Sequence, residues 1–402
     1  MVKIKNYIDS SSSNFRQYLI IFICFFLNLV DGVDVLVMSY TAPVIVSNWD
    51  IASDALGIVF SSGILGMAIG ALLLASYADK IGRKKIILIS IIIISIGVIL
   101  TGFSQNLYHL IIFRFFSGVG IGAILATTVS LVSECSPNKS KDFWISFILS
   151  GYPVGAILAG YFSNIILADY SWEFVFFIFG TTSLVFIPIV YLFISESVDF
   201  LNTDQNKNQN KPVLSLFSES YLNKTIKLWI AFFFSFACLY FLISWIPKLV
   251  TESGLSLKLG IYSGTIFNLG AFFGIITQGY FSSKFGLKKT IFCFLFLTSV
   301  IMTQIDFLIG TNFMLIVFGI LGFSIQGGFV GLYSVAARIY PSKFKTTGIG
   351  WGIGAGRLGA VIGPLAAGIF IASGLGISTI FLIFAICTLI SAVVTYFIDV
   401  EK

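Results

Sequence analysis

The chain has 402 residues, of which 57% are hydrophobic and only 10% are charged, and its mean hydropathy is +0.99. This composition excludes an ordinary soluble domain and predicts an integral membrane protein. Five scattered cysteines and a single histidine accompany a formal net charge of +6. Because none of them is clustered, we expect no disulfide framework, no metal site and no cofactor.

Twelve apolar runs follow one another along the chain, and each is long enough to cross a bilayer, which takes about 20 residues. We expect every run to be a helix, because a backbone segment in lipid must satisfy its own hydrogen bonds. The predicted spans are 17–46, 55–78, 86–104, 107–134, 142–167, 173–194, 226–250, 258–282, 290–309, 312–337, 346–372 and 376–398. The fold class is therefore an all-α membrane protein with twelve transmembrane helices.

A polar stretch divides these spans into two sets of six. Residues 202–211 are rich in Asn, Gln and Lys and have no apolar periodicity, which is typical of a flexible linker. The expected organisation is an N-terminal segment 1–16, a six-helix bundle 17–194, a linker 195–225, a second six-helix bundle 226–398 and a C-terminal tail 399–402.

The basic residues predict the orientation. With the N-terminus placed in the cytoplasm, twenty of the 24 Lys and Arg residues fall on the cytoplasmic side, whereas only Lys248 and Lys258 fall on the other. Both termini are therefore expected in the cytoplasm of a cell (inner) membrane protein. Since this asymmetry accounts for the positive charge, no nucleic-acid partner is expected.

The two sets of spans resemble each other when each residue is compared with the one 204 positions later. Gly66 and Gly70 then coincide with Gly270 and Gly274, and Pro137 coincides with Pro341. This pattern predicts a duplicated six-helix unit in parallel orientation, giving two pseudo-symmetric halves. The four-residue spacing of the glycines predicts close helix packing, either static or sliding during transport.

Two motifs carry a resemblance to a known family. The segment Leu73–Lys85 looks like the loop signature of the major facilitator superfamily, and Arg114–Gly122 is similar to that superfamily's signature in the fourth span. More narrowly, Asp31-Gly-Val-Asp34 and the segments Ser195–Leu201, Ser244–Pro247 and Thr347–Pro364 resemble the aromatic acid:proton symporters. The resemblance implies a secondary transporter of small aromatic acids that uses protons.

Charges inside predicted spans point to function, because a centred Asp or Arg costs about 2.5–3.5 kcal/mol on insertion scales. Asp31 and Asp34 are three residues apart and so share one helical face. Two neighbouring carboxylates in a dry site do not both ionise easily, so one is expected to hold a proton and to couple proton movement to transport. Alternatively, one of them is a structural carboxylate.

Arg114 and Arg357 are the complementary intramembrane charges, one in each half. A guanidinium can hold a carboxylate through two hydrogen bonds, so either residue could bind the substrate's acid group. Arg357 is favoured by its depth in the span, and the alternative is that one arginine pairs permanently with Asp31 or Asp34. Further candidate substrate-binding residues are Tyr152, Tyr240, Trp245, Asn268 and Trp351.

The loop containing Asp79, Gly82 and Arg83 is a candidate gate. Gly82 permits a tight turn, and Asp79 could cap or pair with the other half when the cytoplasmic side is shut. Glu134 and Arg338 occupy repeat-related positions and suggest a second charge relay. The alternative is that these charges serve only the orientation of the chain.

These observations predict proton-coupled uptake of a small organic, aromatic carboxylate by alternating access. The partners expected are this acid, protons and the lipid bilayer, and the protein is expected to act as a monomer. Two alternatives are a proton-driven exporter of small hydrophobic compounds and a membrane sensor with a transport fold. An enzyme is not expected, because the sequence shows no nucleophile–base pair, metal cluster or phosphate loop.

Overall fold

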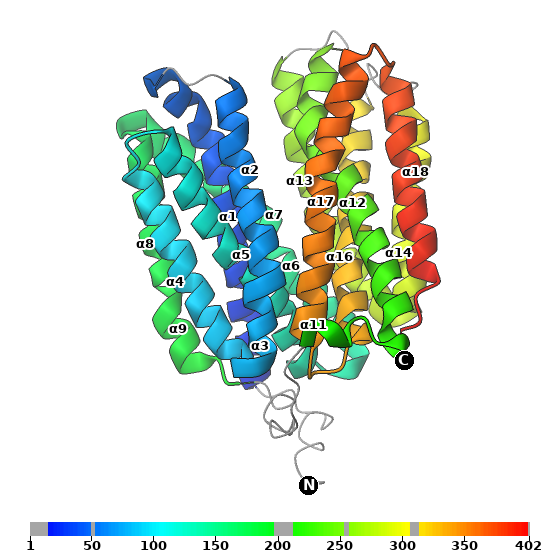
Figure 1. Cartoon of the computed structure of the whole chain (residues 1–402). Helices are drawn as coiled ribbons and strands as arrows, with labels where there is room; N and C mark the ends of the chain where they lie inside the picture. Colours follow the sequence, from blue (N-terminus) through cyan, green and yellow to red (C-terminus); the bar gives the residue numbers. More distant parts are fainter. Residues whose placement is uncertain (1–14, 50–52, 197–211, 253–256, 306–312, 401–402) are drawn as a thin grey trace. The chain divides into compact units, whose positions relative to one another are not determined.

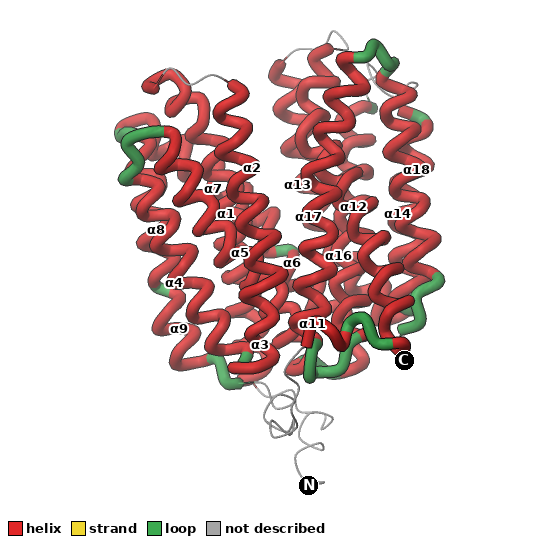
Figure 2. Tube along the Cα trace, in the orientation of Figure 1, coloured by secondary structure: helices red, strands yellow, loops and turns green. Residues whose placement is uncertain are grey.

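A computed structural model of the chain describes residues 15–49, 53–196, 212–252, 257–305 and 313–400. Throughout these residues the regular elements are helical (Figure 2). This agrees with the all-α class predicted from the apolar runs, in which helices satisfy their own backbone hydrogen bonds.

The helices of the first half follow in chain order from blue to green in Figure 1. They are α1 (Phe15–Trp49), α2 (Ser53–Ile69), a π-helical turn (Gly70–Leu74), α3 (Ala75–Ile81), α4 (Arg83–Gly102), α5 (Leu107–Cys135), a 3-10 turn (Asn138–Ser140), α6 (Lys141–Leu149), α7 (Gly151–Asp169), α8 (Trp172–Leu184) and α9 (Phe186–Phe193).

The second half continues from green to red in the same view. Its helices are α11 (Pro212–Ser215), α12 (Glu219–Glu252), α13 (Leu257–Phe285), α14 (Leu287–Thr303), α16 (Met314–Ile339), α17 (Lys345–Ala372) and α18 (Ile377–Tyr396).

Within the described residues, ten helical segments are long and apolar enough to cross a membrane. Helices α13 and α14 occupy the two other spans expected at 258–282 and 290–309. Helix α12 begins at Glu219 rather than near 226, so it and α11 take up part of the segment expected as a linker. Residues 197–211 of that segment lie outside the described residues.

Two expected spans are interrupted, and a proline follows each interruption. The span expected at 142–167 ends its first helix at Leu149, four residues before Pro153, and the span expected at 173–194 ends its first helix at Leu184, four residues before Pro188. A proline ring clashes with the carbonyl four residues earlier and removes a hydrogen-bond donor. Both breaks therefore fall one turn before a proline, although α17 continues through Pro364.

The chain divides into two compact units. Unit 1 comprises Met1–Trp144, Ile148–Leu216 and Tyr340–Gly354, and unit 2 comprises Ile145–Phe147, Phe217–Ile339 and Ala355–Lys402. In unit 1, α1 packs on α7, α2 packs on α5, and α4 packs on both α5 and α8. In unit 2, α13 packs on α16, and α18 packs on α12 and α14. The beginning of α17 thus belongs to unit 1, although it follows the linker in the sequence.

Glycines set how closely these helices approach. A Cβ atom at Gly66 or Gly70 would collide with the backbone of α5, and a Cβ atom at Gly270 or Gly274 would collide with the backbone of α16. Small residues at a helix crossing allow this backbone-to-backbone approach in membrane proteins. The same close crossing is therefore built twice, once in each unit, at repeat-related positions.

Candidate functional site

Asp31 and Asp34 both lie on α1 and are 3% and 4% exposed, respectively. Gly32, between them, lies against α7 so closely that a Cβ atom there would collide with the backbone carbonyl of Tyr152. The two carboxylates therefore sit at a tight helix crossing, away from bulk water. Burial of this kind is costly for a charged group unless it is paired.

Arg114, on α5, supplies that pairing for Asp34. Its Nη1 atom donates to Asp34 Oδ1 at 2.7 Å, and its Nη2 atom donates to the backbone carbonyl of Asp34 at 3.1 Å. Arg114 is itself only 5% exposed. The sequence left two roles open for Arg114, which were binding of the substrate and an ion pair with Asp31 or Asp34. The structure shows the ion pair with Asp34.

A second polar contact joins α1 to α5 nearly two turns earlier on α1. Asn28 donates through Nδ2 to the carbonyl of Cys24 at 2.8 Å and to Thr128 Oγ1 at 3.3 Å. Asn28 and Asp31 are three residues apart, as are Asp31 and Asp34, so the three form a polar stripe on α1. Asn28 and Thr128 were not among the predicted site residues, and the only signal for them was an asparagine within an apolar run.

Arg357 lies on the part of α17 that belongs to unit 2, and Tyr240 of α12 is its partner. The guanidinium donates through Nη1 to the Tyr240 hydroxyl at 2.5 Å, and its Cζ atom lies 5.3 Å from the ring centre of Phe236 and 5.8 Å from that of Tyr240. The two rings are stacked, so α12 presents an aromatic surface that holds the guanidinium by cation–π attraction. Phe236 was not predicted from the sequence.

The other predicted substrate-binding residues divide between the two units. Tyr152 and Trp351 are half-buried in unit 1, and Asn268 in unit 2 donates to the carbonyl of Gly264 on its own helix at 3.0 Å. Trp245 belongs to α12, and its side chain lies outside the described residues.

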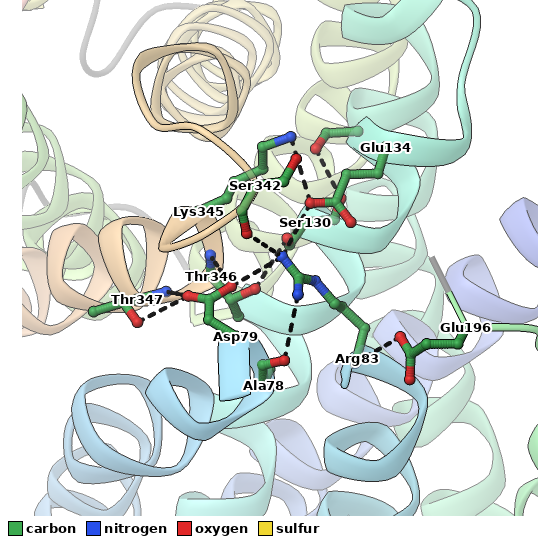
Figure 3. Close-up of polar contacts among 11 residues, drawn as sticks. Ala78, Asp79, Arg83, Ser130, Glu134, Glu196, Ser342, Lys345, Thr346 and Thr347 are labelled. Carbon is green, nitrogen blue, oxygen red and sulfur yellow. Dashed lines mark hydrogen bonds and ion pairs between the residues drawn. The ribbon is translucent and has the colours of Figure 1, made fainter. Parts of the chain in front are cut away.

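The predicted gate residues Asp79, Arg83 and Glu134 come together in unit 1 (Figure 3). Gly82 connects α3 to α4 with a φ of +106°, a conformation that only glycine adopts readily. The turn places Arg83 beside Asp79, with Nη2 and Oδ1 2.9 Å apart, and both side chains are buried. The tight turn expected at Gly82 is therefore present.

Asp79 also binds the N-terminus of α17. Its carboxylate accepts hydrogen bonds from the backbone N–H of Thr346 at 3.2 Å, from the N–H of Thr347 at 2.7 Å and from the Thr347 hydroxyl at 2.9 Å (Figure 3). The first N–H groups of a helix lack partners within the helix and carry partial positive charge. A carboxylate from α3 thus caps a helix that begins more than two hundred residues later.

Arg83 links this cap to a second acidic residue. Its Nη2 atom lies 3.1 Å from Glu134 Oε1 and donates to the carbonyl of Ser342 at 2.6 Å, while Lys345 lies 3.5 Å from the same Glu134 oxygen. Glu134 ends up between two cations in a buried position, as Figure 3 shows. Ser342, Lys345, Thr346 and Thr347 were missed by sequence reasoning, because contacts of this kind depend on tertiary packing.

Glu196 completes the cluster from the start of the linker. Its Oε1 atom accepts from the backbone N–H of Arg83 at 2.8 Å, so it caps the N-terminus of α4. The repeat-related loop has the same turn at Gly286, with a φ of +98°, but among the described residues no atom lies within 4 Å of the position that a Cβ atom would take there, whereas the corresponding position at Gly82 is filled by Glu196. Ser283, which replaces Asp79 there, donates to Gly279 on its own helix at 3.2 Å. Arg338, the remaining predicted gate residue, lies on α16 in unit 2.

Within the described residues, no three His, Cys, Asp or Glu side chains gather in a way that could hold a metal ion. The chemistry available at the polar clusters is therefore that of carboxylates and guanidinium groups, which exchange protons and bind anions.

Comparisons with known proteins identify relatives over nearly the whole chain. Residues 21–279 and 262–402 match the sequence profile described as the Major Facilitator Superfamily. The chain is 29% identical to the gallate transporter of Pseudomonas putida, over 94% of this chain and 91% of that protein. It is 31% identical to the 3-(3-hydroxy-phenyl)propionate transporter of Escherichia coli strain K12, over 91% and 90%, and 28% identical to the benzoate transport protein of Acinetobacter baylyi, over 91% and 86%.

Solved structures share the fold. The proton:xylose symporter XylE, bound to 6-bromo-6-deoxy-D-glucose, superposes with a TM-score of 0.82 at 14% identity, covering 97% of this chain and 98% of that one. A variant of the fucose:proton symporter FucP of E. coli superposes with a TM-score of 0.77 at 16% identity, covering 97% of this chain and 100% of that one.

Proposed function

We propose that this chain takes up a small aromatic carboxylate together with protons by alternating access. The chain belongs to the Major Facilitator Superfamily, and it is a multi-pass secondary transporter and not an enzyme. The substrate class is supported by the relatives, whose names specify gallate, benzoate and 3-(3-hydroxy-phenyl)propionate. Each of these acids combines an aromatic ring with a carboxylate.

The observation that carries the substrate proposal is the setting of Arg357. The guanidinium rests on the aromatic surface of Phe236 and Tyr240 and donates to a neutral hydroxyl. A guanidinium oriented in this way is preorganised to grip a carboxylate through two hydrogen bonds, while the neighbouring rings suit a flat aromatic body. Arg114 is paired with Asp34 in the structure.

Proton coupling follows from the charge of the substrate. Entry of one anion into a membrane-negative cell costs about 2.3 kcal/mol per 100 mV, so accumulation requires at least one accompanying proton. Asp34 and Asp31 are the buried carboxylates on α1 that we assign to carrying it. Protonation of Asp34 would loosen its ion pair with Arg114 and so connect proton binding to a movement of α1 against α5.

The polar cluster around Asp79 is assigned to gating. Its carboxylate holds the N-terminus of α17 in the structure, and this contact is suited to form in one state of the transport cycle and to break in another. With both termini in the cytoplasm, as the distribution of basic residues predicts, this latch lies on the cytoplasmic side of the membrane. The transporter is proposed to work as a monomer.

Counterflow in proteoliposomes tests the substrate class. Vesicles are loaded with one unlabelled acid, and entry of its labelled form is measured for benzoate, gallate and 3-(3-hydroxy-phenyl)propionate, with acetate and succinate as aliphatic controls. We expect exchange of at least one aromatic acid. No exchange is expected in liposomes without the protein or with acetate and succinate. Efflux of hydrophobic cations under a proton gradient would favour an exporter, and no exchange of any compound would favour a sensor.

A further inference from the structure

A small cavity lies beside Asp34 in unit 1, between α1, α4 and α8. The residues that line it are Val30, Val33, Asp34, Val37, Ile94, Val98, Phe179 and Ser183. Its volume, measured for the centre of a water-sized sphere, is about 10 Å³, and about that much space is needed to hold one water molecule. Of these lining residues, only Asp34 and Ser183 have polar side chains.

One oxygen of Asp34 lacks a hydrogen-bond donor in the part of the chain that the structure describes. Oδ1 receives the guanidinium of Arg114 at 2.7 Å, whereas Oδ2 is buried and accepts from no described group. Leaving a buried charged acceptor unsatisfied costs at least about 1–3 kcal/mol. A donor that fits the cavity would remove this cost.

Ser183 is the other polar group at the cavity, and its hydroxyl already has two hydrogen-bond partners. It donates its hydroxyl proton to the carbonyl of Gly180 at 2.7 Å, and the hydroxyl of Ser95 on α4 lies 2.6 Å from it. Because the Ser183 proton is committed to Gly180, Ser95 is the donor in that pair. A hydroxyl oxygen accepts two hydrogen bonds, so Ser183 Oγ retains one acceptor position.

Asp34 Oδ2 therefore lacks a donor among the described residues and Ser183 Oγ can accept one more, so a ligand that donates twice and is no larger than one oxygen atom fits both groups. We propose that this cavity binds a single water molecule, which donates one proton to Asp34 Oδ2 and the other to Ser183 Oγ. A metal cation fits poorly, because hard cations take six or more oxygen ligands. The bound water would bridge α1 to α8 and satisfy the carboxylate while it is ionised.

The consequence for transport rests on the function proposed above, in which Asp34 carries the proton. By donating to Oδ2, the water would leave both oxygens of the Asp34 carboxylate hydrogen-bonded and so hold the side chain in place. Ser183 is then a positioning residue that acts through the water. The charged group that contacts Asp34 is Arg114 on α5, Asp31 lies three residues earlier on α1 itself, and the residues of α4 and α8 that line the cavity include no titratable group.

Infrared spectroscopy of the full-length protein in lipid tests the site directly. An O–H stretching band of an internal water is expected to shift when the sample is exchanged from H₂O into H₂¹⁸O. The band should disappear in Ser183→Ala, which removes the acceptor, and in Val98→Ile, which fills the cavity while leaving both polar groups. Thr182→Val is the matched control, because Thr182 is an exposed neighbour that donates only to its own helix, at Ile178. Absence of the band in the parent, or its survival in both cavity variants, overturns the proposal.

Gradient-driven accumulation provides the second measurement and separates this proposal from the proposed function. Both cavity variants should slow accumulation about tenfold, the equivalent of about 1.4 kcal/mol, because they remove the hydrogen bond that holds the carboxylate. Thr182→Val should leave accumulation unchanged. If the water band is lost in both variants while accumulation stays as in the parent, the water site stands and its role in transport fails. If the band is unaffected in both variants while Asp34→Asn still uncouples transport, the proton role stands and the water site fails.

Discussion

Arg114 holds Asp34 at two points, donating to the carboxylate at 2.7 Å and to the backbone carbonyl of the same residue at 3.1 Å. The side chains are 6% and 3% exposed, so the pair is shielded from water. This geometry ties α5 to both the charge and the backbone of α1, at the place where Gly32 brings α1 against α7.

The first prediction concerns the stability of this pair. Arg114→Leu should destabilise the protein by about 3–5 kcal/mol, because it leaves a carboxylate buried without its counter-charge. Combining it with Asp34→Asn should recover most of the loss, because the remaining group is neutral. Thermal unfolding in detergent measures both effects, and losses that simply add in the double variant would show that the two side chains are not coupled.

The second prediction concerns substrate affinity. Arg357→Lys should weaken binding of an aromatic acid such as benzoate about tenfold or more, because an ammonium cannot reproduce the two-point grip of a guanidinium. A hydrogen bond to a charged group contributes about 1.5–3 kcal/mol, which corresponds to this change in affinity. Isothermal titration with benzoate measures it, and Arg16→Lys, at an exposed position, is the control. Equal affinity in parent and variant would exclude Arg357 as the anion-binding group.

The third prediction concerns the cap on α17. Asp79→Asn should slow counterflow about tenfold or more while benzoate binding remains measurable, because the residue biases conformations without lining the substrate site. An anion in a favourable, partly buried position at a helix N-terminus contributes up to about 2 kcal/mol. Ser283→Ala is the matched control, since Ser283 stands at the repeat-related position and bonds only to its own helix. Undiminished turnover of Asp79→Asn would refute the latch.

The fourth prediction concerns the glycine crossings. Gly66→Ala and Gly270→Ala should each destabilise the protein by about 1–3 kcal/mol, because the added methyl group would collide with the backbone of the facing helix. Gly376→Ala is the control, since among the described residues no atom lies within 4 Å of the position that its Cβ atom would take, and its φ is −63°. Unfolding temperatures in detergent provide the comparison, and variants as stable as the control would contradict the packing argument.

Much of the fold could be predicted because hydropathy and duplication are properties of the sequence itself. The turn at Gly82 is an example, since the repeat-related Gly286 stands in a matching segment and both adopt a positive φ. The helix breaks after Leu149 and Leu184 each precede a proline by four residues, but α17 continues through Pro364, so the prolines alone did not predict where helices break. The glycine turn is a local signal, and a linear reading detects it.

The contacts of the candidate site were harder to predict from the sequence, because they join segments that lie far apart in the chain. Two arginines and two aspartates allowed several pairings, and only packing of α1 against α5 selects Arg114 with Asp34 across 80 positions. The partners of Asp79 at the start of α17 carry no charge, so no charge pattern marked them. The cavity beside Asp34 depends on how the side chains of three helices fit together, which no sequence pattern encodes.

The central claim is that Asp34 couples a proton to the entry of an organic anion, with Asp31 beside it. The direct measurement is accumulation of the labelled acid found by counterflow, in proteoliposomes with an imposed inward proton gradient, for the parent, Asp34→Asn, Asp31→Asn and the exposed control Asp169→Asn. Asparagine keeps the shape but cannot titrate. Accumulation is therefore expected to be lost in Asp34→Asn and to be reduced to an equal or lesser degree in Asp31→Asn. In at least one of these two variants, exchange of labelled for unlabelled acid should be reduced less than accumulation is. Asp169→Asn should behave as the parent does. If both α1 variants accumulate the acid as well as the parent does, and a protonophore still collapses that accumulation, the proton is carried elsewhere and the account is contradicted.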